Sequence, residues 1–327
     1  MSLRLPKIGI TMGDPAGIGP ETALKTASER RFDNNAEFVL YGSPNIIAAA
    51  AELAEKGEGE HCAFNIRATG NLKFDKAFVG TPNPLCGAAA LAAVRAAVED
   101  ALAGEIDAVI TAPMCKASVN MAGIDFTGHT EFIASLCGVP DAEIAMRQSA
   151  GKLRVAFVTT HIPIRDVPDA VTPERIAKTA ELLVESIVEE GVPEPLIAIA
   201  GLNPHAGEDG FMGREDEEIV KPAAANLQKR GFRVEGPFPS DTLFVKETLA
   251  RFDGVVAMYH DQGHIPFKML AFDKGVNSTL GLPIIRTSPD HGAAFPIAWG
   301  RGRVDMGSIL AAAELAVAKA KTRRARE

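Results

Sequence analysis

The sequence predicts an α/β protein in which parallel strands alternate with helices. Short apolar runs of strand length recur along the chain, and most are followed by a glycine- or proline-containing turn and a helical pattern. Polar side chains, histidines in particular, gather directly after several of these runs, as is usual for ligand sites in open α/β sheets. Because 327 residues are many for one hydrophobic core, two domains are expected.

The first strand is expected at 7–12, followed by a glycine-rich turn at 13–19 and by a helix whose first turn contains Pro20. The glycine spacing of this turn matches neither GxGxxG nor a phosphate loop with its lysine, so a structural turn and a ligand contact both stay open. The next expected elements are a strand at 38–43, a helix at 44–56, a strand at 77–80 in an irregular stretch, a helix at 86–103, a strand at 106–113 and a helix at 128–136.

Three later apolar strands each lead to a histidine, namely His161, His205 and His260. Residues 255–295 hold the densest series of polar groups, and they contain glycines that allow a positive φ or a close approach to a ligand, at 263, 275, 281 and 292. The other expected elements are a strand at 153–161, a helix at 173–190, a strand from 196, a helix opened by an acidic run at 215–218 that serves mainly capping and solubility, a strand and turn at 234–242, and a helix at 304–321.

Composition excludes several classes of function. A net charge of −8 argues against a nucleic-acid surface, and the basic tail at 319–326 is expected to be a solvated helix end. No apolar run approaches the roughly 20 residues of a membrane span, and no signal segment is expected. The scattered cysteines indicate free thiols in a reducing compartment, so a cytoplasmic protein is expected; they are Cys62, Cys86, Cys115 and Cys137.

A divalent metal site is the first functional hypothesis. One histidine after a strand is usually structural, but His161, His205 and His260 would converge if their strands end at one sheet edge. Neutral imidazole is the commonest ligand for zinc and related ions, and three protein ligands with one open position form the catalytic arrangement. Asp241 and Asp261 are candidate carboxylate ligands, or partners that fix a histidine tautomer.

An anion site is the second hypothesis. Lys268 and Arg286 supply positive charge and Asn277 a neutral donor, which suits a phosphorylated substrate because a guanidinium can hold phosphate with two hydrogen bonds. All three are expected in loops beside glycine or proline. His129 and Thr130, at the start of a helix, can present further donors to an anion.

Seven motifs in one order resemble the 4-hydroxythreonine-4-phosphate dehydrogenase family of vitamin B6 biosynthesis over nearly the whole chain. They are ITMGDPAGIGPE at 10–21, GHTE at 128–131, VTTHIPIR at 158–165, GLNPHAGE at 201–208, PSDTLF at 239–244, MYHDQGHIPFK at 258–268 and GVNSTLGLPIIRTSPDHG at 275–292. The resemblance implies a homodimer of two-domain α/β/α subunits, related to isocitrate and isopropylmalate dehydrogenases, with the site in a cleft between the domains at the dimer interface. One domain is expected at 1–128 plus 287–327 and the other at 129–286.

The resemblance also implies residue roles. One divalent metal, zinc, magnesium or cobalt, would be bound across the dimer, near Asp241, by His161, His205 and His260. The implied substrate-binding residues are His129, Thr130, Lys268, Asn277 and Arg286. NAD or NADP would bind at DHGAAFPIAWGRG, which is similar to the adenosine-side loop of isocitrate dehydrogenases, through His291, Gly292, Ala294 and Gly300. The general base stays open among Asp241, Asp261 and Lys116, and Lys116 could equally be a substrate contact or a solvated helix start.

The implied activity is metal-assisted, NAD(P)-dependent oxidation of 4-phosphohydroxy-L-threonine with decarboxylation, giving 3-amino-2-oxopropyl phosphate for pyridoxal phosphate biosynthesis. His264 and the pair 298–299 are more similar to a branch acting on 4-phospho-D-threonate or 4-phospho-D-erythronate, which is the alternative. Pro296 and Trp299 stand where many relatives have an acidic residue and glycine. An aromatic dihydrodiol dicarboxylate is a more distant substrate, and the rivals from other classes are a non-catalytic phosphometabolite-binding protein and a metal-dependent hydrolase.

Overall fold

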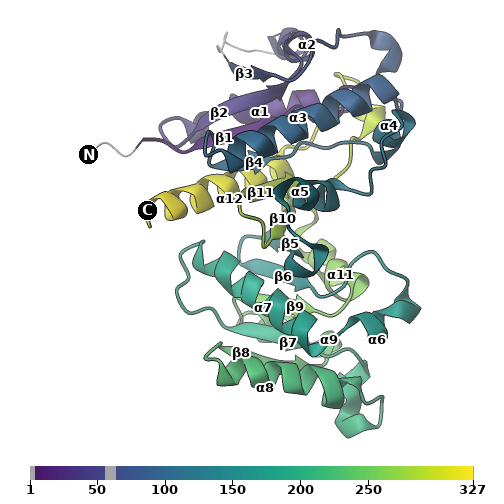
Figure 1. Ribbon diagram of the computed structural model, residues 1–327, viewed down its shortest axis with the longest axis vertical. Coiled ribbons are helices and arrows are strands. Elements are labelled where there is room, and N and C mark those ends of the chain that lie inside the picture. The colour runs from purple at the N-terminus through teal and green to yellow at the C-terminus, as the bar shows by residue number, and fades with distance from the viewer. Residues whose placement is uncertain (1–3, 56–63, 327) are drawn as a thin grey trace. The chain divides into compact units, whose positions relative to one another are not determined.

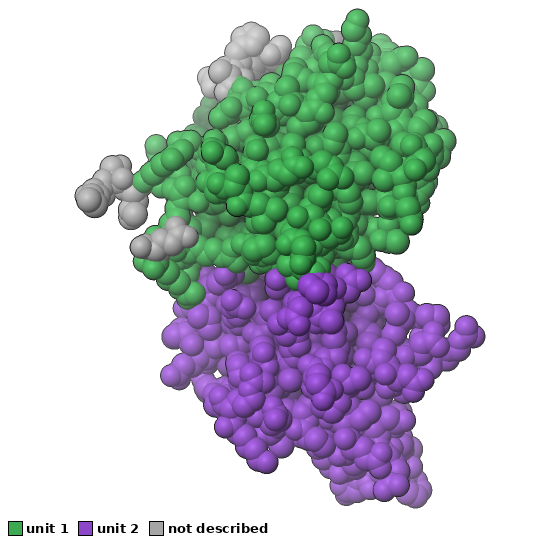
Figure 2. Space-filling view, in the orientation of Figure 1, with its two compact units in different colours: residues 1–139, 282–327 green, residues 140–281 purple. Residues whose placement is uncertain are grey.

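The computed structural model describes residues 4–55 and 64–326, so Cys62 and the last residue of the helix expected at 44–56 lie outside the described part. The chain forms two compact units: unit 1 comprises residues 1–139 and 282–327, and unit 2 comprises residues 140–281 (Figure 2). Three cysteines of the described part are free thiols, namely Cys86, Cys115 and Cys137.

The unit boundaries differ from the expected domain boundaries at 128/129 and 286/287. Helix α5 (His129–Cys137) packs against α3 (Pro84–Leu102), which places it in unit 1. Strand β11 (Ile285–Pro289) pairs in parallel with β4 (Ala108–Ile110), which places Arg286 in unit 1 as well. Packing and strand pairing therefore shift both boundaries.

Unit 1 contains a parallel sheet whose strands, in the described chain, run in the order β3-β2-β1-β4-β11 (Figure 1). Helix α3 packs on β1 and β2, and α12 packs on β4 and β11, so the apolar runs of the central strands are buried. The strands not yet given are β1 (Lys7–Thr11), β2 (Glu37–Gly42) and β3 (Asn65–Ala68). The helices not yet given are α1 (Gly19–Ala27), α2 (Pro44–Glu55), α4 (Lys116–Met121) and α12 (Gly307–Arg324).

One expectation for unit 1 is wrong, and a second holds only in part. Residues Lys76–Phe78 form a 3-10 turn instead of a strand, because the Asp75 carboxylate accepts the Ala77 N–H at 2.8 Å and starts the turn. The edge strand is β3, whose side chains are all exposed and show no apolar periodicity. The basic tail is less solvated than expected: Lys319 is buried, and Arg324 donates to both carboxylate oxygens of Asp107, at 2.6 and 2.8 Å.

Unit 2 contains the other strands of the described chain, in the order β10-β5-β6-β9-β7-β8. β10, β5 and β6 pair antiparallel, whereas β6, β9, β7 and β8 pair in parallel. The strands are β5 (Ala145–Ala150), β6 (Leu153–Phe157), β7 (Ile197–Ala200), β8 (Val234–Phe238), β9 (Gly254–Ala257) and β10 (Val276–Leu280). The helices are α6 (Val167–Ala170), α7 (Pro173–Val188), α8 (Lys221–Lys229), α9 (Ser240–Leu243), α10 (Lys246–Leu249) and α11 (His260–Ala271).

The loop placement expected for Lys268, Asn277 and Arg286 is wrong, since they lie on α11, β10 and β11. Of the glycines at 263, 275, 281 and 292, which were expected to allow a positive φ or a close approach to a ligand, Gly281 alone has a positive φ, of 84°. Gly263 is required for another reason, because a Cβ at this point of α11 would lie 2.6 Å from the Phe157 ring. Among the described helices, none combines the length and apolar content that a membrane span needs.

Candidate active site

Three adjacent parallel strands of unit 2 lead to the predicted metal-binding histidines. β9 pairs with β6 on one side and with β7 on the other, so the carboxyl ends of these strands lie at one edge of the sheet. His161 follows β6, His205 follows β7, and His260, after β9, is the first residue of α11. The sheet edge that the metal hypothesis requires is therefore present.

His161 and His260 line one pocket of about 260 Å³, together with Asp261 and apolar side chains such as Ile164. The centroids of the two imidazole rings lie 5.5 Å apart. His260 Nδ1 lies 2.7 Å from Asp261 Oδ1. A carboxylate in this position accepts the Nδ1–H, so the lone pair of His260 is on Nε2, the nitrogen that a metal would use.

His205 begins an unusual backbone segment. Residues 205–209 all have positive φ values, between 42° and 80°, and left-handed backbone costs roughly 1–2 kcal/mol for each residue other than glycine. Asp216 fixes the start of the segment: it is fully buried and accepts the N–H of Leu202 at 2.7 Å and of Asn203 at 2.9 Å. Asp216 is therefore a member of the acidic run whose role goes beyond the capping and solubility expected for most of it. Enforced strain of this kind is concentrated at functional sites.

The donor set fits a divalent metal, since imidazole nitrogens and carboxylate oxygens at one sheet edge are its usual ligands. Within the described residues of one chain, however, no group of three or more His, Cys, Asp or Glu side chains is placed to hold an ion. His205 and Asp241 do not line the pocket of His161 and His260. The three-histidine site stays a prediction, which the resemblance distributes over two subunits.

Arg286 is the centre of a second cluster, in unit 1. It is 4% exposed and donates from Nε and Nη2 to Thr111 Oγ1, at 3.1 and 2.8 Å. Burial lowers the pKa of Arg286 to about 10, against an opposing effect of Glu131, so the guanidinium is still charged at neutral pH. Thr111 follows β4, the strand that pairs with β11. The sequence offered no signal for Thr111, because threonine is common at strand ends.

His129, the first residue of α5, belongs to this cluster. Its pKa is lowered to about 3, first by burial and then by the positive charges of Arg286 and Lys116. Its Nε2 is buried and has no hydrogen-bond partner among the described residues. A buried ring nitrogen without a partner, beside two cations, suits an incoming anion. Thr130 is the next residue of α5, and Lys116 is the first residue of α4, so both readings of Lys116 stay open.

We expect His129→Gln to lose less stability than the wild type when the pH falls from about 7.5 to about 5. The folded-state pKa, about 3, lies below the ordinary value of 6.5, so acid favours the unfolded chain. The stability gained from a neutral His129 is complete above pH 6.5 and is lost as the pH falls towards 3. Melting temperatures across this range test the expectation, with His291→Gln as the control for removing one histidine. An equal acid-induced decrease in all three proteins would contradict burial of a neutral ring.

The predicted cofactor segment packs against the glycine-rich turn at 13–19. The Ile18 N–H donates to Ala293 O at 2.9 Å, and a Cβ at Gly17 would lie 2.5 Å from the same oxygen. The turn therefore has a structural role, while a direct ligand contact stays open. Gly292 faces open space: among the described residues beyond its chain neighbours, none comes within 4 Å of where a Cβ would stand, which suits close approach of a cofactor. The other predicted contacts lie on the same segment and are His291, Ala294 and Gly300.

Trp299 anchors the far end of this segment. Its Nε1–H donates to Pro15 O at 2.8 Å, and its backbone N–H donates to Glu21. Its ring lies against Phe74, with centroids 4.2 Å apart. Trp299 has a φ of 58°, a left-handed conformation that glycine adopts without a steric penalty. These contacts explain how a bulky residue is accommodated where the resemblance implies glycine.

The remaining predicted substrate residues lie in unit 2. Asn277 stands beside Gln148 in the β10–β5 pair, and Lys268 Nζ lies 5.6 Å from the centroid of the Phe272 ring.

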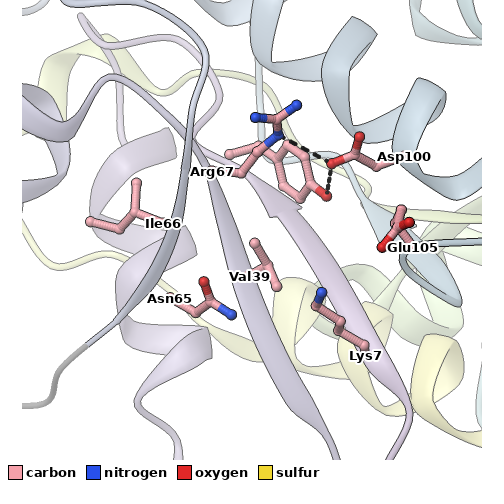
Figure 3. Close-up of a pocket in the computed structure, with 8 residues that line it drawn as sticks. Lys7, Val39, Asn65, Ile66, Arg67, Asp100 and Glu105 are labelled. Carbon is pink, nitrogen blue, oxygen red and sulfur yellow. Dashed lines mark hydrogen bonds and ion pairs between the residues drawn. The ribbon is translucent and has the colours of Figure 1, made fainter.

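A larger pocket, of about 410 Å³, lies in unit 1 and is lined by none of the predicted residues (Figure 3). There Asp100 accepts the Tyr41 O–H at 2.8 Å and pairs with Arg67 at 3.4 Å, so these two opposite charges engage each other.

Comparison with known proteins gives a consistent picture. The family model of the pyridoxal phosphate biosynthetic protein PdxA matches residues 33–316. A 4-hydroxythreonine-4-phosphate dehydrogenase from Desulforapulum autotrophicum is 41% identical, covering 96% of each chain. A protein from Oceanobacillus iheyensis that carries the name of a D-threonate 4-phosphate dehydrogenase is 40% identical, covering 97% of this chain and 99% of that protein.

Solved structures agree. The crystal structure of a 4-hydroxythreonine-4-phosphate dehydrogenase from Burkholderia phymatum has a TM-score of 0.80 and 40% identity, covering 96% of this chain and 98% of that chain. The fold and the matched length both agree with the expected resemblance. The chain belongs to the PdxA family of pyridoxal phosphate biosynthetic proteins.

Proposed function

We propose that this protein is an NAD(P)-dependent oxidoreductase that oxidises 4-phosphohydroxy-L-threonine and releases CO2, giving 3-amino-2-oxopropyl phosphate for pyridoxal phosphate biosynthesis. The observation that carries the proposal is the 41% identity, over 96% of both chains, to a relative named for this activity. The pocket of His161 and His260 and the buried Arg286 support it, because the reaction needs a place for a metal and a place for a phosphate.

The metal would be held by His161, His205 and His260, drawn from both subunits. When bound, a zinc, magnesium or cobalt ion supplies Lewis-acid polarisation of the substrate oxygens and favours loss of the hydroxyl proton. Asp261 orients the His260 ring, and Asp216 holds the strained segment that carries His205. These two carboxylates are therefore positioning groups.

The residues of the chain bind the substrate and handle its proton. Arg286, with His129 and Thr130, would receive the phosphate, and Lys268 and Asn277 would contact the rest of the substrate. NAD(P), held at the segment of His291 and Gly292, would supply the acceptor for the C3 hydride, and a base of the chain would take the C3 hydroxyl proton. The resulting 3-keto acid loses its carboxylate as CO2 by cleavage of the C1–C2 bond, and C2 then takes up a proton. Asp241 and Lys116 are better candidates for the base than Asp261, which is engaged with His260.

We propose that the protein acts as a cytoplasmic homodimer with shared active sites. Helix α11 and the residue that follows it expose large apolar side chains close in sequence to His260, namely Ile265, Met269, Leu270 and Phe272. Met269 is 82% exposed and Phe272 75%, and exposed apolar surface of this kind is typical of a protein interface. The free thiols of the described part suit a reducing compartment.

Oxidation of 4-phospho-D-threonate or 4-phospho-D-erythronate is the second candidate function. It is favoured by the 40% identity to the relative named for D-threonate 4-phosphate. These substrates have a hydroxyl in place of the 2-amino group and would use the same metal and phosphate groups.

The decisive experiment follows NADH absorbance with 4-phosphohydroxy-L-threonine, 4-phospho-D-threonate and 4-phospho-D-erythronate, each with and without EDTA. We expect EDTA-sensitive NADH formation that is fastest with the amino substrate. A preference for either hydroxy acid would support the second candidate. Absence of EDTA-sensitive NADH formation with all three would refute both.

A further inference from the structure

His264 lies flat between two other rings in unit 2. The His260 ring is stacked on one side, with centroids 4.0 Å apart and planes 13° apart. The Phe157 ring is stacked against His264 at 4.3 Å and 24°. His264 is 7% exposed, and Phe157 is fully buried in β6, so the inner end of the stack is fixed by the core. The stack thus connects the core of unit 2 to a predicted metal ligand.

Both ring nitrogens of His264 have partners within the protein. Nδ1 lies 3.1 Å from His260 O, and a carbonyl oxygen can only accept, so Nδ1 carries the hydrogen. Nε2 lies 3.5 Å from Gln148 Nε2, which can only donate, so Nε2 accepts. The spacing of four residues between His260 and His264 would suit two ligands on one helix face, but the parallel stack and these contacts direct His264 away from that role.

We propose that His264 is a positioning residue for His260. Asp261 holds Nδ1 of the His260 ring, and the flat face of His264 sets the plane of that ring, so the two contacts together direct Nε2 towards the pocket shared with His161. Neither contact alone fixes the ring, because a single hydrogen bond still allows rotation about it. The inference rests on the proposed metal function of His260.

The test uses a matched pair of variants, His264→Phe and His264→Leu, with Co²⁺ as the probe. Both replacements are apolar and fill the buried position, but only phenylalanine keeps a flat ring for stacking. Co²⁺ affinity is measured by competition with a chelator, and the visible absorption bands of bound Co²⁺ report its ligand geometry. Melting temperatures show that each variant is folded, and Phe157→Leu serves as a second way to loosen the stack.

We expect His264→Leu to weaken Co²⁺ binding by about 10- to 100-fold and to shift the visible bands. His264→Phe should stay within about threefold of the wild type with unchanged bands, and Phe157→Leu should fall between the two. Wild-type affinity and bands in His264→Leu would overturn the inference while leaving the proposed function intact. If the wild-type protein itself bound no Co²⁺, the proposed metal function would fail, and the inference with it.

Discussion

A His260→Ala variant is expected to lose about a thousandfold or more in kcat, because it removes a predicted ligand of the catalytic metal. His161→Ala should lose a similar factor, since the two rings lie 5.5 Å apart and line the same pocket. Wild-type protein treated with EDTA should fall to the same level. Adding back Zn²⁺ or Co²⁺ should restore the EDTA-treated wild type and not the variants, because the variants lack a ligand.

Asp261→Asn is the matched control for this prediction. It keeps the size of the side chain and leaves all three histidines in place, but it weakens the contact to His260 Nδ1. A loss of about 10- to 100-fold is expected for such a supporting group, well short of the loss of a ligand. Full turnover of His260→Ala in the presence of EDTA would show that the metal mechanism is wrong.

The fold was predictable where apolar residues dominate. Strands β1, β4, β7 and β9 are short apolar runs, and their buried side chains carry the signal that a sequence pattern detects. Strand β5 was missed because it contains Arg147 and Gln148, which are both 1% exposed. Arg147 is tolerated there because it donates to Ser186 Oγ at 2.6 Å and pairs with Glu190, both on distant parts of the chain. Such long-range compensation leaves no local pattern.

The residues of the candidate site also separate into those that the sequence could identify and those that it could not. His161, His205 and His260 could be picked out because each follows an apolar strand, and those strands are neighbours in the sheet. Thr111 and Asp216 could not, because their roles depend on which backbone and side-chain groups fold back onto them. The left-handed segment after His205 was equally invisible, since it includes residue types that rarely adopt positive φ. Residues whose role is to hold other groups in place through hydrogen bonds are therefore the ones that the sequence alone does not reveal.

An Arg286→Lys variant is expected to raise the KM for the phosphorylated substrate by about 100-fold with a smaller effect on kcat, because one charged group with its hydrogen bonds contributes about 1.5–3 kcal/mol. Lysine keeps the charge but cannot reproduce the planar set of donors. Two of those donors, Nε and Nη2, are directed at Thr111 Oγ1, which fixes the plane of the guanidinium. Steady-state kinetics at pH values between 7 and 9, where a pKa of about 10 keeps Arg286 charged, provide the measurement.

The Arg286→Lys test needs a second variant, Thr111→Val, and a control substrate without phosphate. Valine preserves the shape of Thr111 and removes its hydroxyl, so the guanidinium stays but loses two hydrogen bonds, and an increase in KM of about 10-fold is expected. With 4-hydroxy-L-threonine, which has no phosphate, the wild type should be slow and neither substitution should slow it further. If Arg286→Lys impaired both substrates equally, Arg286 would act on the fold or on the reacting carbon atoms, and the phosphate would have to bind elsewhere. A penalty that appears only with the phosphate ester would locate the phosphate at Arg286, because the two substrates differ only in that group.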